Sequence, residues 1–165
     1  MIAIVEAGVD DLATIRTLAY AIWPSTYGPI LSKEQLDFML SHFYAVETLA
    51  KTVELGHRYF LVTENGNYLG FMGYEHHYRG NPVTRIHKIY VLPETQGRGI
   101  GNMLIEKAEM LGKENHDETL SLNVNRYNKA LGFYQKIGFV ITEEVNIDIG
   151  HGYLMEDFIM EKPLE

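Results

Sequence analysis

The chain has 165 residues, 46% of them hydrophobic and 22% charged, which fits one globular domain spanning residues 1–165. It has no cysteine, so disulfides, thiolate metal ligands and cysteine nucleophiles are excluded, and a formal net charge of −8 without a Lys/Arg cluster argues against nucleic-acid binding. There is neither an apolar run of membrane-spanning length nor a basic, signal-like N-terminus, so we expect a cytoplasmic protein that does not enter a membrane.

The N-terminal third predicts one strand followed by helices. Residues 2–5 form a short apolar run, and apolar residues at helical spacing come after it. Asp10 or Asp11 can cap the first helix, and Pro24 should end it, because proline disfavours helical geometry in the residue before it. Residues 23–29, with two prolines and two aromatic side chains, should then form a loop.

Two further helices are expected before the next strand. Ser32 and Gln35 have the spacing of a capping box, in which each side chain bonds the backbone of the other residue. This pair marks the start of the second helix. A third helix, over residues 46–55, should end at Gly56, because glycine readily adopts the left-handed conformation that closes helices.

A hairpin of two strands follows these helices. Residues 59–63 and 68–74 are rich in aromatic and apolar side chains, as strands usually are. The dipeptide Asn65-Gly66 lies between them and favours a type I′ turn, whose twist matches that of two paired strands. The two strands are therefore expected to pair antiparallel.

The most informative stretch is a strand followed by a glycine-rich turn and a helix. Residues 86–92 are β-rich, and Pro93 ends the run because it has no N–H to donate. An amphipathic helix is expected from residue 103 to 113. Three glycines stand at alternate positions before it: Gly97, Gly99 and Gly101. The free N–H groups and dipole of a helix start attract anions, and glycine lets an anion approach closely, so we predict a phosphate-binding turn.

Two common phosphate-binding patterns do not fit this turn. The P-loop requires Gly-Lys-Ser/Thr at the helix start, where residues 101–103 of this chain read Gly-Asn-Met. The dinucleotide-binding fingerprint requires a third glycine at the position of Leu104, which is a large residue. Both patterns are therefore disfavoured.

The C-terminal half predicts a strand, a short helix and a closing hairpin. The expected elements are strands at residues 119–124, 139–147 and 153–160, and a helix at residues 127–136 closed by Gly138. Together with the earlier elements, this order predicts an α/β fold with a mixed sheet flanked by helices. No internal repeat or linker interrupts it, which again favours one domain.

The glycine turn and a second block together resemble the GCN5-related N-acetyltransferase (GNAT) family. The pattern Gln96-x-x-Gly99-x-Gly101 after a strand is similar to the acetyl-CoA motif of that family. Residues 125–139 resemble its later block, Asn-x-x-Ala…Phe-Tyr-x-x-x-Gly-Phe. The resemblance covers about residues 57–162. It implies a central, mostly antiparallel sheet flanked by helices and splayed at the acetyl-CoA site.

Two other segments resemble a bacterial branch of the family that includes polyamine N-acetyltransferases. They are the aromatic segment at residues 23–27 and the ending at residues 149–160. The resemblance implies transfer of an acetyl group from acetyl-CoA to a primary amine, such as a polyamine or another small amine, directly within a ternary complex. Two alternatives stay open: a protein or peptide amine as the acceptor, and a family member that holds acyl-CoA without catalysing a reaction.

The resemblance also assigns a donor site. Backbone N–H groups of the turn would take the pyrophosphate, and the preceding strand would pair with the pantetheine arm like an added β-strand. Asn128 resembles the asparagine that bonds the pantetheine, with Asn125 as a competitor and a helix cap as the structural explanation of either. Arg98 could bond the phosphates or simply be solvated. The predicted acetyl-CoA contacts are Ile89, Tyr90, Val91, Gln96, Gly97, Arg98, Gly99, Ile100, Gly101, Asn102, Asn128 and Tyr134.

For catalysis, Tyr134 resembles the general acid of the family, which would protonate the departing sulfur. Without the motif, it would be read as a core tyrosine of an amphipathic helix. A base is also required, because an aliphatic amine with a pKa of about 10.4 arrives mostly protonated. Residues 85–91 carry no carboxylate, and a water-mediated route is an alternative to a dedicated base. The candidate bases are His87, Glu75, His76 and His77.

The acceptor site is expected to be aromatic and acidic. Trp23, Tyr27 and Tyr74 could face a cationic amine through cation–π contacts, or could instead pack the N-terminal helices on the sheet. Glu75 or Glu156 could supply the countercharge. The acidic net charge fits a cationic substrate, although it also serves solubility. We therefore expect a small-molecule amine as partner and no metal, with a homodimer left open.

Overall fold

The computed structural model describes residues 1–165. The chain divides into two compact units. The first unit is Met1–Glu75 with His87–Lys107, and the second is His76–Ile86 with Ala108–Glu165. Strand β4 (Val83–Val91) and helix α4 (Ile100–Glu114) each contribute residues to both units. The expectation of one domain stays a prediction.

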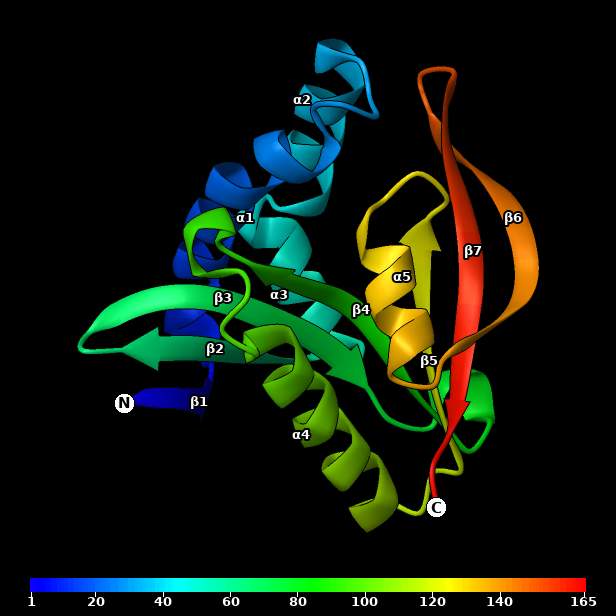
Figure 1. The fold of residues 1–165 in the computed structure, drawn as a ribbon. Coiled ribbons are helices and arrows are strands. Elements are labelled where there is room, and N and C mark those ends of the chain that lie inside the picture. Colours follow the sequence, from blue (N-terminus) through cyan, green and yellow to red (C-terminus); the bar gives the residue numbers. More distant parts are fainter. The chain divides into compact units, whose positions relative to one another are not determined.

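Strands and helices follow one another along the chain broadly in the predicted order (Figure 1). The strands are β1 (Ile2–Glu6), β2 (Arg58–Glu64), β3 (Asn67–Glu75), β4, β5 (Thr119–Asn125), β6 (Val140–Gly150) and β7 (Tyr153–Pro163). The helices are α1 (Leu12–Tyr27), α2 (Lys33–Phe43), α3 (Val46–Glu54), α4 and α5 (Ala130–Lys136). Short 3-10 turns occur at η1 (Val9–Asp11), η2 (Tyr78–Gly80) and η3 (Pro93–Thr95). None of the helices combines the length and the apolar character needed to cross a membrane.

The strands form a seven-stranded sheet in the order β1-β2-β3-β4-β5-β7-β6. In the first unit, β2 pairs antiparallel with both β1 and β3. In the second unit, β7 pairs antiparallel with both β5 and β6, while Val83–Ile86 of β4 pair in parallel with Thr119–Leu122 of β5. This mixed, mostly antiparallel sheet flanked by helices confirms the predicted α/β fold class. The splay predicted at the acetyl-CoA site stays a prediction.

In the first unit, helices lie against both faces of the sheet. Figure 1 shows α1 and α3 behind β2 and β3, with the start of α4 in front of them. Ile15 and Ala19 of α1 and Leu104 and Ile105 of α4 are completely buried. Ile15 and Ala19 are four positions apart and therefore lie on one side of α1, and burying each large apolar side chain contributes roughly 1.5–3 kcal/mol.

The predicted end of the first helix at Pro24 is wrong. Helix α1 continues for another turn, and the Gly28 N–H donates to the Pro24 carbonyl over 3.0 Å. Proline removes one backbone hydrogen bond, but continuing the helix buries Trp23 and Tyr27, whose ring centroids are 4.6 Å apart. Burial of two aromatic side chains offsets the lost bond. The predicted aromatic loop is therefore largely helical.

The predicted capping role of Asp10 or Asp11 is also wrong in detail. The N-cap residue of α1 is Asp11, but its carboxylate makes no capping bond to that helix. Instead, Asp11 Oδ2 accepts from the Gly8 N–H over 2.8 Å, which closes the η1 turn. The side chain therefore satisfies the backbone before the helix rather than within it.

Other local predictions are confirmed. Ser32 Oγ accepts from the Gln35 N–H over 3.1 Å and caps α2, which confirms the predicted helix start, while the return bond of the capping box from the Gln35 side chain stays a prediction. Asn65 and Gly66 have φ values of 51° and 80°, as a type I′ turn between β2 and β3 requires. Both features depend on residues within a few positions of one another, which explains why the sequence alone predicts them.

Candidate active site

The glycine turn lies between η3 and α4 in the first unit. Gly99 has φ +78°, a conformation that L side chains rarely adopt, although a Cβ there would meet no atom within 4 Å. Glycine is therefore required at this position by the backbone conformation and not by a lack of space for a side chain. Helix α4 begins at Ile100, and its first intrahelical bond runs from the Met103 N–H to the Gly99 carbonyl over 3.0 Å. The N–H groups of the first turn precede that bond and remain available to an anion.

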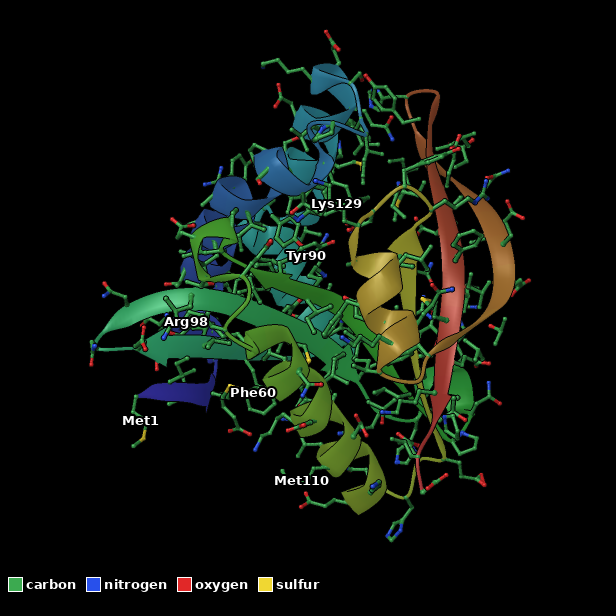
Figure 2. The ribbon with its side chains drawn as sticks, in the orientation of Figure 1. Met1, Phe60, Tyr90, Arg98, Met110 and Lys129 are labelled. Atoms are coloured by element: carbon green, nitrogen blue, oxygen red, sulfur yellow. The ribbon has the colours of Figure 1, made fainter.

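Arg98 is engaged beside this turn. Its two terminal nitrogens donate to the two Glu64 carboxylate oxygens over 3.0 and 2.6 Å. The hydrogen bonds from Arg98 hold the pKa of Glu64 below its usual range. Figure 2 places Arg98 at the exposed side of the first unit, near β2 and β3. Arg98 would have to exchange Glu64 for a phosphate in order to bind one.

The β4 residues predicted to pair with pantetheine are partly buried. Tyr90 shares a hydrogen bond of 2.8 Å with the Tyr27 hydroxyl, and its ring lies against Trp23 and Phe71 at centroid distances of 5.7 Å. On β3, a Cβ at Gly70 would lie 2.6 Å from the Tyr90 carbonyl oxygen. Sequence reasoning missed this glycine, although an isolated glycine in a strand often marks a close backbone approach.

The predicted acceptor residues are buried. Trp23 is 4% exposed, Tyr27 8% and Tyr74 3%. Trp23 packs against Tyr27, and Tyr74 stacks on Phe60 with centroids 5.5 Å apart. Their packing role is therefore observed, while their contact with an amine stays a prediction.

Two of the candidate bases lie side by side in the first unit. His87 Nε2 is 2.7 Å from Glu75 Oε1, which is hydrogen-bonding distance. Their side chains are 20% and 19% exposed, so the pair is largely removed from water. A carboxylate that holds one ring nitrogen of a histidine fixes which nitrogen carries the proton. The pair therefore has the arrangement of an oriented histidine base.

His57 completes this cluster and was not among the predicted residues. Its Nε2 lies 3.3 Å from the same Glu75 oxygen, and its ring stacks on His87 with centroids 4.0 Å apart and planes 6° apart. His57 immediately precedes β2, far from His87 in sequence. No spacing rule links the two, so nothing in the sequence could have identified it.

The electrostatics of the cluster differ from residue to residue. Burial, and then the charge of Lys88, lower the pKa of His57 to about 4, so that ring is neutral at neutral pH. Burial lowers the pKa of Lys88 to about 8. The Lys88 Nζ donates to the Tyr59 hydroxyl over 3.3 Å and lies 5.8 Å from the centre of the Tyr44 ring. The cluster thus contains a neutral imidazole beside a carboxylate and a poorly hydrated ammonium.

The three side chains also include the donor atoms of a metal site. One ligand atom each from His57, Glu75 and His87 lies within 4.8 Å of the others. A histidine binds a metal through a lone pair in the plane of its ring. Because the two rings are nearly parallel and stacked, no single ion can lie in both ring planes. The observed geometry suits hydrogen bonding, and the expectation of no metal stays a prediction.

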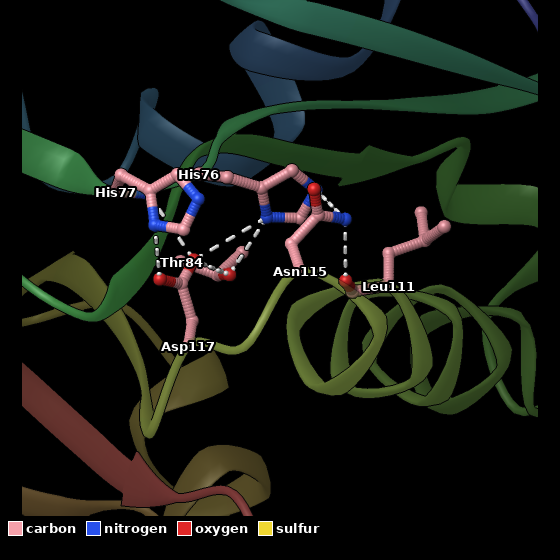
Figure 3. Close-up of polar contacts among 6 residues, drawn as sticks. All are labelled: His76, His77, Thr84, Leu111, Asn115 and Asp117. Atoms are coloured by element: carbon pink, nitrogen blue, oxygen red, sulfur yellow. Dashed lines mark hydrogen bonds and ion pairs between the residues drawn. The ribbon is translucent and has the colours of Figure 1, made fainter.

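The other two candidate bases belong to a separate network in the second unit, drawn in Figure 3. Thr84 Oγ1 donates to Asp117 Oδ2 over 2.7 Å, so it must accept from His76 Nδ1, which lies 2.9 Å away. His76 Nε2 is then left to accept from Asn115 Nδ2 at 3.2 Å. His77 Nδ1 lies 2.8 Å from Asp117 Oδ1. Both ring nitrogens of His76 are engaged within the protein, which favours a structural role.

The second unit contains the remaining predicted site residues. Tyr134 on α5 is 7% exposed, and its ring contacts Phe133 and Phe139 at centroid distances of 5.3 and 5.7 Å. Asn128 Oδ1 accepts from the Ala130 N–H, and Asn125 Oδ1 from the Tyr127 N–H, both over 2.9 Å. Both asparagines therefore stabilise the turn before α5, but the N-cap of that helix is Lys129, which makes no side-chain capping bond, so the helix-cap explanation is wrong in detail.

Comparison with known families, proteins and structures identifies relatives that cover most of this chain. The profile of the family described as "Acetyltransferase (GNAT) domain" matches residues 29–153. The spermidine N(1)-acetyltransferase of Thermoplasma acidophilum is 26% identical over 99% of this chain and 98% of its own. The crystal structure of the PaiA N-acetyltransferase from the same organism, in complex with coenzyme A, has a TM-score of 0.83 and 25% identity, and the match covers 99% of both chains.

Other relatives match over a shorter region. The peptidyl-lysine N-acetyltransferase YjaB of Salmonella typhimurium is 37% identical over 43% of this chain and 47% of its own length. The chain spans less than half the length of this and two further curated N-acetyltransferases that it matches. The family profile, by contrast, covers most of the chain, including β2 to β6 and the glycine turn. The chain therefore belongs to the GNAT acetyltransferase family.

Proposed function

We propose that the protein transfers an acetyl group from acetyl-CoA to a primary amine. The observation that carries this proposal is the glycine turn at the start of α4, directly after β4 and η3. Its free N–H groups suit a pyrophosphate, and Gly99 leaves the approach open. Residues 96–102 would hold the phosphates. They would do so through backbone N–H groups, without a bound metal ion.

The strand before the turn would hold the rest of the donor. The backbone of Ile89, Tyr90 and Val91 would pair with the pantetheine arm, and such main-chain bonds give affinity without requiring particular side chains. Arg98 would add a charge-assisted bond on leaving Glu64. We propose that Asn128, which belongs to the second unit, makes a further contact with the pantetheine. Asn125 is the alternative residue for this contact.

Glu75 and His87 would remove the proton of the incoming ammonium group. Glu75 accepts from His87 Nε2–H, so the basic lone pair lies on Nδ1. When Nδ1 takes the proton, the adjacent carboxylate stabilises the resulting imidazolium, as in other carboxylate–histidine pairs. The neutral amine then attacks the thioester carbonyl.

Tyr134 would supply the proton that the leaving thiolate requires. The C–S bond breaks as the new C–N bond forms, and the phenol would protonate the departing thiolate, after which the phenolate would take back the proton that the nitrogen loses on becoming an amide. Because the chain has no cysteine, a thioester intermediate on the protein is excluded, which favours direct transfer in a ternary complex. The products are the N-acetylated amine and free CoA.

The acceptor is proposed to be a polyamine or another small amine. Supporting this are the net charge of −8 and the full-length similarity to a protein named as a spermidine N-acetyltransferase. A peptide amine is the alternative, because another relative is named as a peptidyl-lysine N-acetyltransferase. A member that only holds acyl-CoA is the remaining alternative.

Release of free thiol from acetyl-CoA tests these alternatives directly. The protein should be mixed with acetyl-CoA and either spermidine, a monoamine or a lysine peptide, and thiol followed over time. We expect release that depends on the amine and is fastest with spermidine. Faster release with the peptide would favour the protein acceptor, whereas binding of CoA without any release would favour the non-catalytic alternative.

A further inference from the structure

His57 lies outside the residues that the proposed reaction uses, yet it touches both members of the acid–base pair. Its ring stacks on His87 at 4.0 Å between centroids and 6° between planes, and its Nε2 lies 3.3 Å from Glu75 Oε1. Its side chain is 14% exposed, so these contacts are largely shielded from water. We propose that His57 is a positioning residue, which holds the His87 ring in the plane and tautomer needed for a base.

The stacked ring of His57 limits how the His87 ring can turn. An imidazole can rotate about its Cβ–Cγ bond, because that torsion has a broad, roughly two-fold profile. The hydrogen bond that His87 Nε2–H donates to Glu75 Oε1 fixes the position of that nitrogen but allows the ring to turn about the contact. A second ring stacked face to face removes this freedom. His57 therefore fixes where His87 Nδ1 points.

The Glu75 carboxylate determines which nitrogen of His57 carries the proton. Two facing lone pairs would repel each other, so the Nε2 that faces the Glu75 carboxylate should carry the hydrogen. His57 and His87 then present N–H groups to one carboxylate oxygen. Glu75 can accept both, since an ionised carboxylate has several acceptor positions.

The charge of the His57 ring affects protonation of His87. His87 must become positively charged when it takes a proton, and a charged ring stacked on it would oppose that step. Lys88 on β4 lowers the pKa of His57, as does burial, so the stacked ring stays neutral. The charged and titratable groups around the stack are Glu75 from β3, Lys88 from β4 and the Tyr59 phenol of β2 that Lys88 bonds. A neutral ring beside a carboxylate favours protonation of His87 alone.

This inference rests on the proposed function, because it assigns His57 a role only if His87 is the base. His57→Phe keeps a stacking ring but removes the polar nitrogens, and His57→Gln keeps an N–H donor but removes the ring. His87→Gln removes the proposed base itself. His42→Gln is the matched control, since His42 lies exposed on α2.

The test is the pH profile of kcat together with the acetyl-CoA KM. We expect kcat of His57→Phe to fall by about tenfold, less than the roughly 10²- to 10⁴-fold expected for loss of a base, with KM little changed. The midpoint of the rising limb should move to higher pH, because Glu75 without its second donor attracts the His87 proton more strongly. His57→Gln should retain that midpoint but lose rate, and His42→Gln should match the wild type.

A second measurement needs no variant. Nitrogen-15 NMR of the histidine rings in the wild-type protein should show His57 neutral and protonated at Nε2 at pH 7. Unchanged pH profiles in both His57 variants, with a slow His87→Gln, would overturn the positioning role alone. A His87→Gln variant at wild-type rate would instead overturn the assignment of the base, and the two failures are therefore distinguishable.

Discussion

At the scale of single residues, Tyr134 carries the most specific chemical expectation. Its ring is held by Phe133 and Phe139, so Tyr134→Phe should keep the packing and remove only the hydroxyl. We expect kcat to fall by about 10²- to 10⁴-fold, the usual scale for positioned acid–base help, with little change in acetyl-CoA affinity. Tyr127→Phe, at a 65% exposed position just before α5, is the control. Equal rates in the two variants would leave Tyr134 as a packing residue only.

His57 predicts how the stability of the fold depends on pH. Its pKa is about 4 in the folded protein and near 6.5 in the unfolded chain, so the unfolded chain binds more protons between these values. Stability should therefore be constant above pH 6.5, fall as the pH drops towards 4, and level off below it. After allowance for screening by solvent, the loss should be about 1–2 kcal/mol.

Chemical unfolding of wild type and His57→Gln at pH 4.5 and 7.5 checks this prediction. The difference in unfolding free energy between the two pH values should be smaller in the variant, because glutamine does not titrate. Carboxylates that titrate below pH 5 contribute equally to both proteins and cancel in the comparison. Identical pH dependence in both proteins would contradict the depressed pKa of His57.

At the scale of elements, the junction of β4, η3 and α4 carries the donor site. Gly101→Ala adds a Cβ at the start of α4, where alanine is a good helix former, so the fold should persist. The added atom should obstruct a bound pyrophosphate and weaken CoA binding strongly in a calorimetric titration. Gly132→Ala in α5, where a Cβ has free space, should leave CoA affinity unchanged. Wild-type affinity in a folded Gly101→Ala variant would rule out this turn as the phosphate site.

The sequence predicts those elements whose signals are local. The Ser32 cap, the turn at Asn65 and Gly66 and the glycine turn each depend on a few neighbouring residues. The end of α1 could not be predicted in this way, because burial of Trp23 outweighs the local effect of Pro24. Propensity gives way to tertiary packing in such cases.

The candidate site shows the same limit. The glycine turn could be proposed from its own residues, and Tyr134 from the resemblance of its segment to the later block of the family. His57 could not, because its contact with His87 arises only when β2, β3 and β4 pair. The engagement of Arg98 in the glycine turn by Glu64 of β2 likewise joins residues that are distant in sequence. Ion pairs and stacked rings of this kind have no sequence period.

At the scale of the whole molecule, the net charge of −8 bears on the choice of acceptor. If the acceptor is a polyamine, attraction to an acidic protein should raise kcat/KM at low salt, and added salt should reduce it as screening grows. A monoamine carries less positive charge, so its kcat/KM should depend less on salt, and it serves as the control. Steady-state rates with spermidine and the monoamine at several salt concentrations test this expectation. Parallel salt dependences would argue against a polycationic acceptor.

The most direct test of the central claim is a single-turnover reaction with carbon-13-labelled acetyl-CoA and excess amine, quenched at intervals and analysed by mass spectrometry. We predict that the label appears on the amine nitrogen at the rate at which free CoA appears, and that no labelled protein accumulates. CoA release at the same rate without any amine, or transfer of the label to the protein before the amine, would contradict direct acetyl transfer by this chain.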